Sequence, residues 1–301
     1  MKKLKTYILP FLGWLFLAYL LCASIYILFL LKTENILPTK LFTIFIPLII
    51  GAAIAFFARG KVLKNVENGR YIFRFRVVDI QFIAVFIFCL LIGFSQLSKS
   101  LYFNLANVLY LNTIDELPKY TQPPFLELGD WYADRQRAIP LHTFERGSLF
   151  NSDKVYVKTL FLLPVFSKEK AYESGAKAWL AFDYSSSMPF EEFVETNGKK
   201  QYDEFLSHFK KINVRAFRYF ESYPENTLKR VYTELARTHS YFQSGYINIY
   251  QGMDTDRDLW AQYYVRQFLY YFIFVIIPLL IVSSLFVRTN HSDSHGNPYQ
   301  A

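Results

Sequence analysis

Cysteine is nearly absent from this sequence and is confined to apolar stretches. The 301 residues include two cysteines, Cys22 and Cys89, and both fall inside long apolar runs. The polar segment between residues 97 and 264 therefore has no thiol, which excludes disulfides and cysteine-ligated zinc from it. That segment is nonetheless long enough to bury a core without such cross-links.

A basic surface of the kind that binds nucleic acid is also missing. The formal net charge is +8, but residues 97–264 contain 20 Lys and Arg against 21 Asp and Glu. The positive excess flanks the apolar runs instead. This distribution predicts no nucleic-acid partner and indicates attraction of the flanking segments to the headgroups of a lipid bilayer.

Motifs for metals and common cofactors are absent as well. The outer segment has too few glycines for a phosphate-binding loop, and His142, His208 and His239 do not form an HExxH pair. Alternating aspartates over 254–258 resemble the start of a calcium loop, but the glycine and glutamate that such a loop requires are missing. We therefore predict no cofactor and no metal site.

Four apolar runs are long enough to cross a bilayer, which takes about 20 residues. They cover residues 7–31, 41–57, 77–94 and 268–287. No charged residue or histidine lies deep within any of them, whereas transporters and pumps usually place such residues there. The runs predict a membrane protein with four transmembrane helices and make a transporter the less favoured interpretation.

A basic loop over residues 59–76 (RGKVLKNVENGRYIFRFR) separates the second and third runs. Short basic loops beside membrane spans remain cytoplasmic. Four spans then place both termini on the cytoplasmic side as well, together with the loop. A further role, docking anionic lipid or a cytoplasmic partner, is a second hypothesis for the same residues. The basic side chains that fix the topology are Arg59, Lys61, Lys64, Arg70, Arg74 and Arg76.

The orientation divides the chain into four parts. Residues 1–96 form the three-helix transmembrane region, 97–264 an extracytoplasmic domain inserted between the third and fourth spans, 265–288 the fourth span and 289–301 a cytoplasmic tail. Within the domain, residues 97–151 have little periodicity and are expected to form an irregular lead-in. Its first part, 97–111, is either an amphipathic helix on the membrane surface or an outward continuation of the third span.

The rest of the outer segment predicts an α/β domain with a mixed sheet. The expected order is strand, strand, helix, strand, helix, strand, and helices between strands imply crossovers. A Ser222–Glu225 capping box is expected to open the second helix. The expected strands cover 154–166, 177–184, 212–223 and 246–250, and the helices start near 189 and 225 with a break at Gly198.

Catalytic candidates are weak. His142 lies in a loop that concentrates acids, bases and aromatics, and Asp183 is followed by Ser185 and two more serines. A serine hydrolase would bring these groups together, but no GxSxG elbow surrounds the serines. Both groups also have a structural explanation. The residues around His142 would form ion pairs that hold the lead-in, and Asp183 with its serines would be a strand end that runs into a helix cap.

The sequence thus favours a protein of a bacterial inner membrane whose periplasmic domain binds a protein partner. Such a partner would belong to an envelope or secretion assembly, or would be a toxin that this chain neutralises as a membrane-bound immunity protein. An envelope hydrolase is the alternative. A cleft that holds His142, a serine and an acid would favour the enzyme, and an exposed apolar patch would favour binding. Bacterial origin is inferred from the absence of disulfides and of outward glycosylation sequons.

Overall fold

The computed structural model divides the chain into two compact units. The first comprises the helices up to Leu105 and those from Arg257 onward, and the second comprises Ala106–Asp256. Each unit has its own packing and is considered separately below. The structure describes residues 4–32, 40–64, 71–72, 75–147, 153–168, 175–239 and 247–287.

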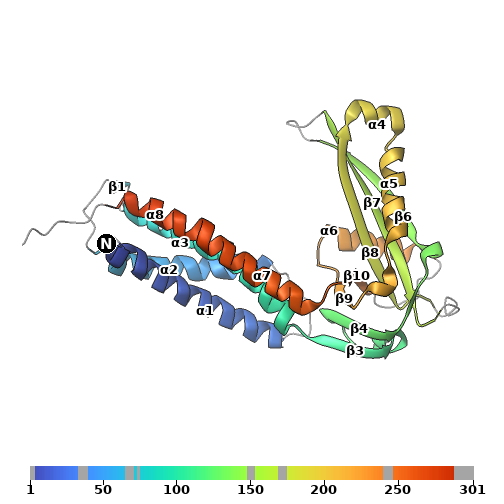
Figure 1. Cartoon of the computed structure of the whole chain (residues 1–301), viewed down its shortest axis with the longest axis horizontal. Helices are drawn as coiled ribbons and strands as arrows, with labels where there is room; N and C mark the ends of the chain where they lie inside the picture. Colours follow the sequence, from blue (N-terminus) through green and yellow to red (C-terminus); the bar gives the residue numbers. More distant parts are fainter. Residues whose placement is uncertain are drawn as a thin grey trace, which may run out of the picture. The chain divides into compact units, whose positions relative to one another are not determined.

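The first unit contains four helices that are long and apolar enough to cross a membrane (Figure 1). The prediction of four long apolar helices is therefore confirmed. Two short strands, β1 (Tyr71–Ile72) and β2 (Phe75–Arg76), pair just before the third helix. The helices are α1 (Leu9–Lys32), α2 (Ile46–Val62), α3 (Val77–Leu105) and α7 (Arg257–Tyr271), which continues into α8 (Ile277–Leu285).

A π-helical turn precedes the proline in each of the three helices that contain one. A proline has no N–H, and its ring clashes with the carbonyl four residues earlier, so a wider turn relieves the clash. The α3 helix has no proline and is α-helical over all of its 29 residues. The turns are η1 (Leu4–Ile8), η2 (Leu41–Phe45) and η7 (Phe272–Ile276), which precede Pro10, Pro47 and Pro278 respectively.

Tyr19 on α1 contacts both α3 and α7. Its hydroxyl donates a hydrogen bond to the carbonyl of Cys89 at 2.7 Å, and its ring lies edge-on to Phe268. Gly93 makes room for this ring, because a Cβ added there would lie 2.1 Å from the Tyr19 hydroxyl. Small residues allow membrane helices to approach closely, and interhelical hydrogen bonds then hold them together.

The second unit is built on an eight-stranded mixed sheet in the order β3-β4-β9-β10-β8-β7-β5, with β6 also paired to β7. The β3–β4 and β8–β10 pairs are parallel and the others are antiparallel, which confirms the predicted mixed sheet. The strands are β3 (Val108–Thr113), β4 (Phe125–Asp130), β5 (Tyr132–Ala133), β6 (Ile139–Arg146), β7 (Lys154–Phe166), β8 (Ala178–Pro189), β9 (Tyr219–Ser222) and β10 (Ile249–Met253).

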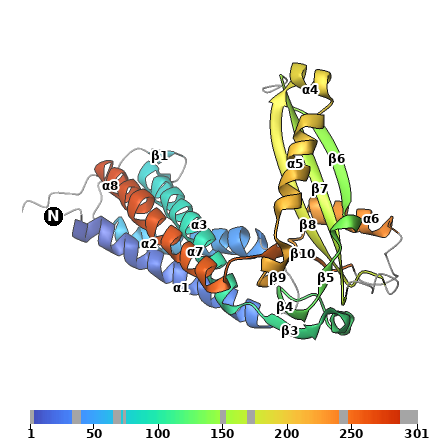
Figure 2. The ribbon, with the colours of Figure 1, turned by 45° about the vertical axis from the view of Figure 1, so that its right-hand side comes forward.

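Helices cover both faces of this sheet. On one face α5 (Lys199–Lys211) buries Phe205 and Phe209, and the Phe209 ring stacks on Phe161 of β7 at 4.5 Å between centroids. On the other face α6 (Thr227–Arg237) buries Tyr232 in a second apolar cluster. Figure 2 shows α5 running along the β6–β7–β8 layer, with the short helix α4 (Phe190–Thr196) at its far end.

The prediction of an irregular lead-in over 97–151 is wrong over most of its length. Helix α3 continues to Leu105, which decides the open question about 97–111 in favour of an extended third helix as far as that residue. Strands β3, β4, β5 and β6 follow. Pro140 obscured the strand pattern, yet it lies on β6, which pairs with β7 alone, and such edge positions tolerate proline.

Two element boundaries in the rest of the domain also differ from the prediction. Strand β8 continues through Ser187 to Pro189 because it pairs with β7 over that whole length, so Ser187 does not open a helix. The expected strand over 212–223 is broken by a 3-10 turn, η6 (Val214–Ala216), and only β9 remains extended.

The helix cap before α6 is also different from the expected one. Asn226 caps the helix by accepting a hydrogen bond from the Lys229 backbone N–H at 3.0 Å. Ser222 lies on β9 instead and accepts a hydrogen bond from Gln122, while Glu225 forms an ion pair with Lys229. The last strand begins at Ile249, three residues later than the predicted 246–250, and residue 246 lies outside the described part.

We expect Gly93→Ala to lower the thermal unfolding midpoint of the protein in detergent. The new methyl group would overlap the Tyr19 hydroxyl, and overpacking of this kind costs about 1–3 kcal/mol. Gly13→Ala is the matched control on α1, since a Cβ there meets no described atom within 4 Å. Equal midpoints for both variants would contradict this account of Tyr19, and Tyr19→Leu should restore the Gly93→Ala protein.

Candidate functional site

The three hydrolase candidates lie on opposite faces of the sheet. His142 of β6 is paired in register with Thr159 of β7, and Thr159 is paired with Tyr184 of β8, so the three side chains lie on one face of the sheet. Neighbouring side chains along a strand point to opposite faces. Asp183 and Ser185 flank Tyr184 on β8, so they point away from His142. The fold therefore does not bring these residues into one cleft.

The surroundings of Asp183 are structural. The Tyr223 hydroxyl points to the Asp183 carboxylate at 3.5 Å, on the face covered by α6. Burial raises the pKa of Tyr223, and the carboxylate raises it further, so this hydroxyl remains a neutral donor. Ser185 is exposed and lies beside Asp183 on the strand. Neither residue has a described base in position to activate it.

His142 is held by a single hydrogen bond to a buried hydroxyl. Its Nδ1 lies 2.7 Å from Oγ1 of Thr159, which is fully buried. The Thr159 hydroxyl makes no other hydrogen bond within the described residues, so we assign it as the donor to Nδ1, and Nε2 then carries the imidazole hydrogen. Burial lowers the pKa of His142, which favours the neutral ring.

An open pocket of about 500 Å³ lies between β6 and the turn that joins α4 to α5. Asn197 and Gly198 form that turn with left-handed backbones, at φ 51° and 69°. A Cβ at Gly198 would lie 3.2 Å from His142 Nε2, so glycine permits the close approach of the turn. We call this the His142 pocket. Its walls are Pro140, His142, Thr196, Asn197, Lys199 and Tyr202.

Exposed apolar side chains gather next to this pocket. Phe144 of β6 is 53% exposed, and Phe190 and Val194 of α4 are 36% and 64% exposed. We call these three residues the α4 patch. The Phe144 ring packs on Phe193 at 4.9 Å between centroids, and the guanidinium of Arg146 lies over the Phe190 ring. The patch is therefore a fixed surface built from two elements.

The α4 patch and the His142 pocket were not found from the sequence. In the segment PFEEFVET, Phe190, Phe193 and Val194 have the spacing of one helix face. That spacing is the signal that could have found the apolar face. Its exposure could not be predicted, because it depends on which strand lies beneath α4.

The structure describes four of the six basic residues that are predicted to fix the topology. The Arg59 guanidinium lies over the Phe56 ring at 4.0 Å, and the Lys61 amine lies 5.4 Å from the Trp14 ring. Arg76 pairs with Asp79 at 3.0 Å in the first turn of α3. Lys64 is exposed in the turn that follows α2. Arg70 and Arg74 lie outside the described residues.

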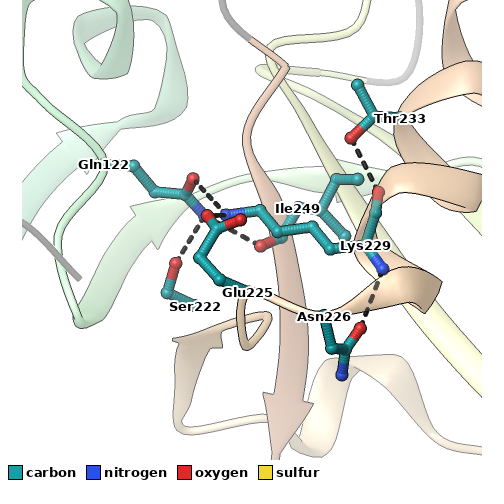
Figure 3. Close-up of polar contacts among 7 residues, drawn as sticks. All are labelled: Gln122, Ser222, Glu225, Asn226, Lys229, Thr233 and Ile249. Atoms are coloured by element: carbon teal, nitrogen blue, oxygen red, sulfur yellow. Dashed lines mark hydrogen bonds and ion pairs between the residues drawn. The ribbon is translucent and has the colours of Figure 1, made fainter. Parts of the chain in front are cut away.

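A polar network around Lys229 holds the end of the sheet together (Figure 3). The ammonium of Lys229 is largely buried, pairs with Glu225, and donates to the side-chain oxygen of Gln122 at 3.3 Å. Gln122 in turn donates to Ser222 of β9 and to the Ile249 carbonyl of β10. Each polar group of the network has a partner, so we interpret it as structural.

The remaining polar candidates have structural surroundings. His208 lies on α5 with its ring near Tyr184, and His239 follows the end of α6. Asp256 pairs with Arg218 rather than facing a cation site. Among the described residues, no three His, Cys, Asp or Glu side chains are grouped as metal ligands.

No protein-family model, curated protein or solved structure matches this chain. The function is therefore inferred from the geometry of the pocket and the patch.

We expect the stability of the domain to depend on the ionisation of Glu221. This carboxyl lies on β9 between Phe125 and Gln251, and burial raises its pKa to about 7. In the unfolded chain it ionises near pH 4.5, so folding loses stability as the pH rises from about 4.5 to 7. Glu221→Gln should therefore raise the free energy of unfolding at pH 8 by about 1–3 kcal/mol.

The measurement is the thermal unfolding midpoint of both proteins across pH 4.5 to 8. The two curves should converge at the acidic end, where the carboxyl is protonated in both states. A constant difference between the variants at every pH would contradict the assigned titration.

Proposed function

We propose that this chain is a multi-pass protein of a bacterial inner membrane whose periplasmic domain binds a protein partner. The proposal places the basic loop and both termini in the cytoplasm, because basic flanks are retained on that side. The near-neutral segment over 97–264 is then periplasmic. The lipid bilayer surrounds the four apolar helices.

The observation that carries the binding proposal is the α4 patch. Single exposed apolar residues are ordinary, whereas contiguous apolar patches on a protein surface mark interaction sites. Phe144, Phe190 and Val194 come from two elements and surround the partly buried Phe193. Aromatic side chains of this kind supply much of the affinity in protein interfaces.

The alternative functions have less support. A serine hydrolase needs nucleophile, base and acid in one cleft, whereas His142 and the Asp183–Ser185 pair point to opposite faces. A transporter needs polar groups along its helices. The apolar runs 7–31, 41–57, 77–94 and 268–287 contain one charged residue, Asp79 at the start of the third run, and it is paired with Arg76.

Two biological settings fit a membrane-anchored binding domain. In one, the domain joins an envelope or secretion assembly. In the other, it captures a toxin that reaches the membrane from the periplasm, as an immunity protein does. Both require the α4 patch to be accessible outside the cytoplasm, so topology and partner contact can be tested separately.

The topology is tested by labelling single new cysteines in intact cells. Cys22 and Cys89 are buried in the helices and provide a silent background. A membrane-impermeant maleimide should label Glu234→Cys, on the exposed side of α6, before the inner membrane is opened. Lys61→Cys should be labelled only afterwards. Labelling of Lys61→Cys first would reverse the proposed orientation.

The binding surface is tested with a photo-crosslinking amino acid at Val194. We expect a discrete protein adduct in membranes of the organism that carries the gene, because Val194 is the most exposed residue of the patch. The same amino acid at Glu234 is the control on the opposite face. Phe144→Ser with Phe190→Ser should abolish the Val194 adduct. Equal adducts at both positions would contradict the proposal.

A further inference from the structure

The walls of the His142 pocket carry a positive charge. Its six wall residues include one full cation, Lys199, and no carboxylate. Within the described residues Lys199 forms no ion pair, whereas the adjacent Lys200 pairs with Glu192 at 3.3 Å. The pocket therefore presents an uncompensated positive charge.

Two other polar groups in the walls can donate hydrogen bonds. The Tyr202 hydroxyl and the Asn197 side-chain amide make no hydrogen bond within the part of the chain that the structure describes. Thr196 is different, because its hydroxyl already donates to the Glu192 carbonyl at 2.8 Å. A negatively charged oxygen group can thus meet Lys199 and find two donors nearby.

The rigid floor of the pocket comes from His142. The imidazole is fixed on one side by the buried Thr159 hydroxyl and packs edge-on against the Tyr202 ring, at 5.3 Å between centroids. Its Nε2 is buried against the turn and has no described acceptor. No group in the floor therefore contributes negative charge that would repel an anion.

The pocket and the α4 patch are adjacent. The His142 and Phe144 rings lie 6.3 Å apart between centroids, and they occupy the same face of β6. A ligand that covers Phe144 and also fills the pocket must combine an apolar surface with an anionic group. A protein surface that carries an acidic side chain beside apolar residues has both properties.

We propose that the partner inserts an Asp or Glu side chain into the His142 pocket, where its carboxylate pairs with Lys199. Its neighbouring apolar residues cover the α4 patch. This inference rests on the proposed function, because it names the chemistry of the partner at the same surface. A partner side chain is favoured over a free small anion because the pocket is wide open and continues into an apolar surface.

Zero-length crosslinking tests this contact directly. A water-soluble carbodiimide joins a carboxylate to an amine as an amide, while the reagent takes up the water and becomes a urea. The reaction needs the two groups in contact. Applied to the full-length protein in membranes, it should produce an isopeptide bond between Lys199 and an Asp or Glu of the partner, identified by mass spectrometry.

The adjacent lysines form a matched pair of variants. Lys199→Gln should abolish the isopeptide and reduce the Val194 photo-adduct about twofold to fivefold, as expected for a partly exposed ion pair. Lys200→Gln should change neither, because Lys200 does not line the pocket. Lys199→Glu should reduce the photo-adduct further by repulsion.

The outcomes distinguish failure of the Lys199 contact from failure of the proposed binding function. A Val194 adduct that persists unchanged in Lys199→Gln, with no isopeptide at Lys199, overturns the inference and leaves the proposed binding function intact. Loss of the photo-adduct on addition of millimolar acetate, without any isopeptide, would assign the pocket to free small carboxylates instead. Absence of both adducts in the parent protein would overturn the proposed function as well.

Discussion

The long antiparallel pairing of β7 with β8 is the constraint on which the α/β domain depends. The two strands stay in register from Lys154 opposite Pro189 to Val165 opposite Ala178. Because side chains alternate between faces, this one register assigns each residue of both strands either to the α5 face or to the α6 face. It creates two apolar clusters instead of one, and each cluster requires its own covering helix.

The same register decides what chemistry the domain can support. The row His142, Thr159 and Tyr184 faces α5, so the histidine is paired with a buried hydroxyl rather than with an acid. A shift of one residue in β8 would bring Asp183 or Ser185 to that face, but it would also move Phe182 out of its cluster. Core packing and the separation of the hydrolase candidates thus have one cause.

Much of the fold follows from local sequence, and the site does not. Strand β7 matches its predicted residues 154–166, because a continuous β-branched and aromatic run has few alternatives. The predicted order of strands and helices from that strand onward is also confirmed. The pairing of β6 with β7 was not predictable, since Pro140 and charged residues gave β6 no strand signal. The His142 pocket depends on that pairing and on the left-handed turn at Gly198.

The short helix α4 connects the stability of the domain to its proposed interaction. A helix of seven residues is not stable alone in water, so α4 depends on its tertiary contacts. Phe193 packs against the sheet and contacts the Phe144 ring, while Phe190 and Val194 remain exposed. A partner that covers these two side chains would supply the apolar burial that α4 lacks. Because α4 ends in the turn that forms the His142 pocket, binding at the patch would also hold Asn197 and Lys199 in place.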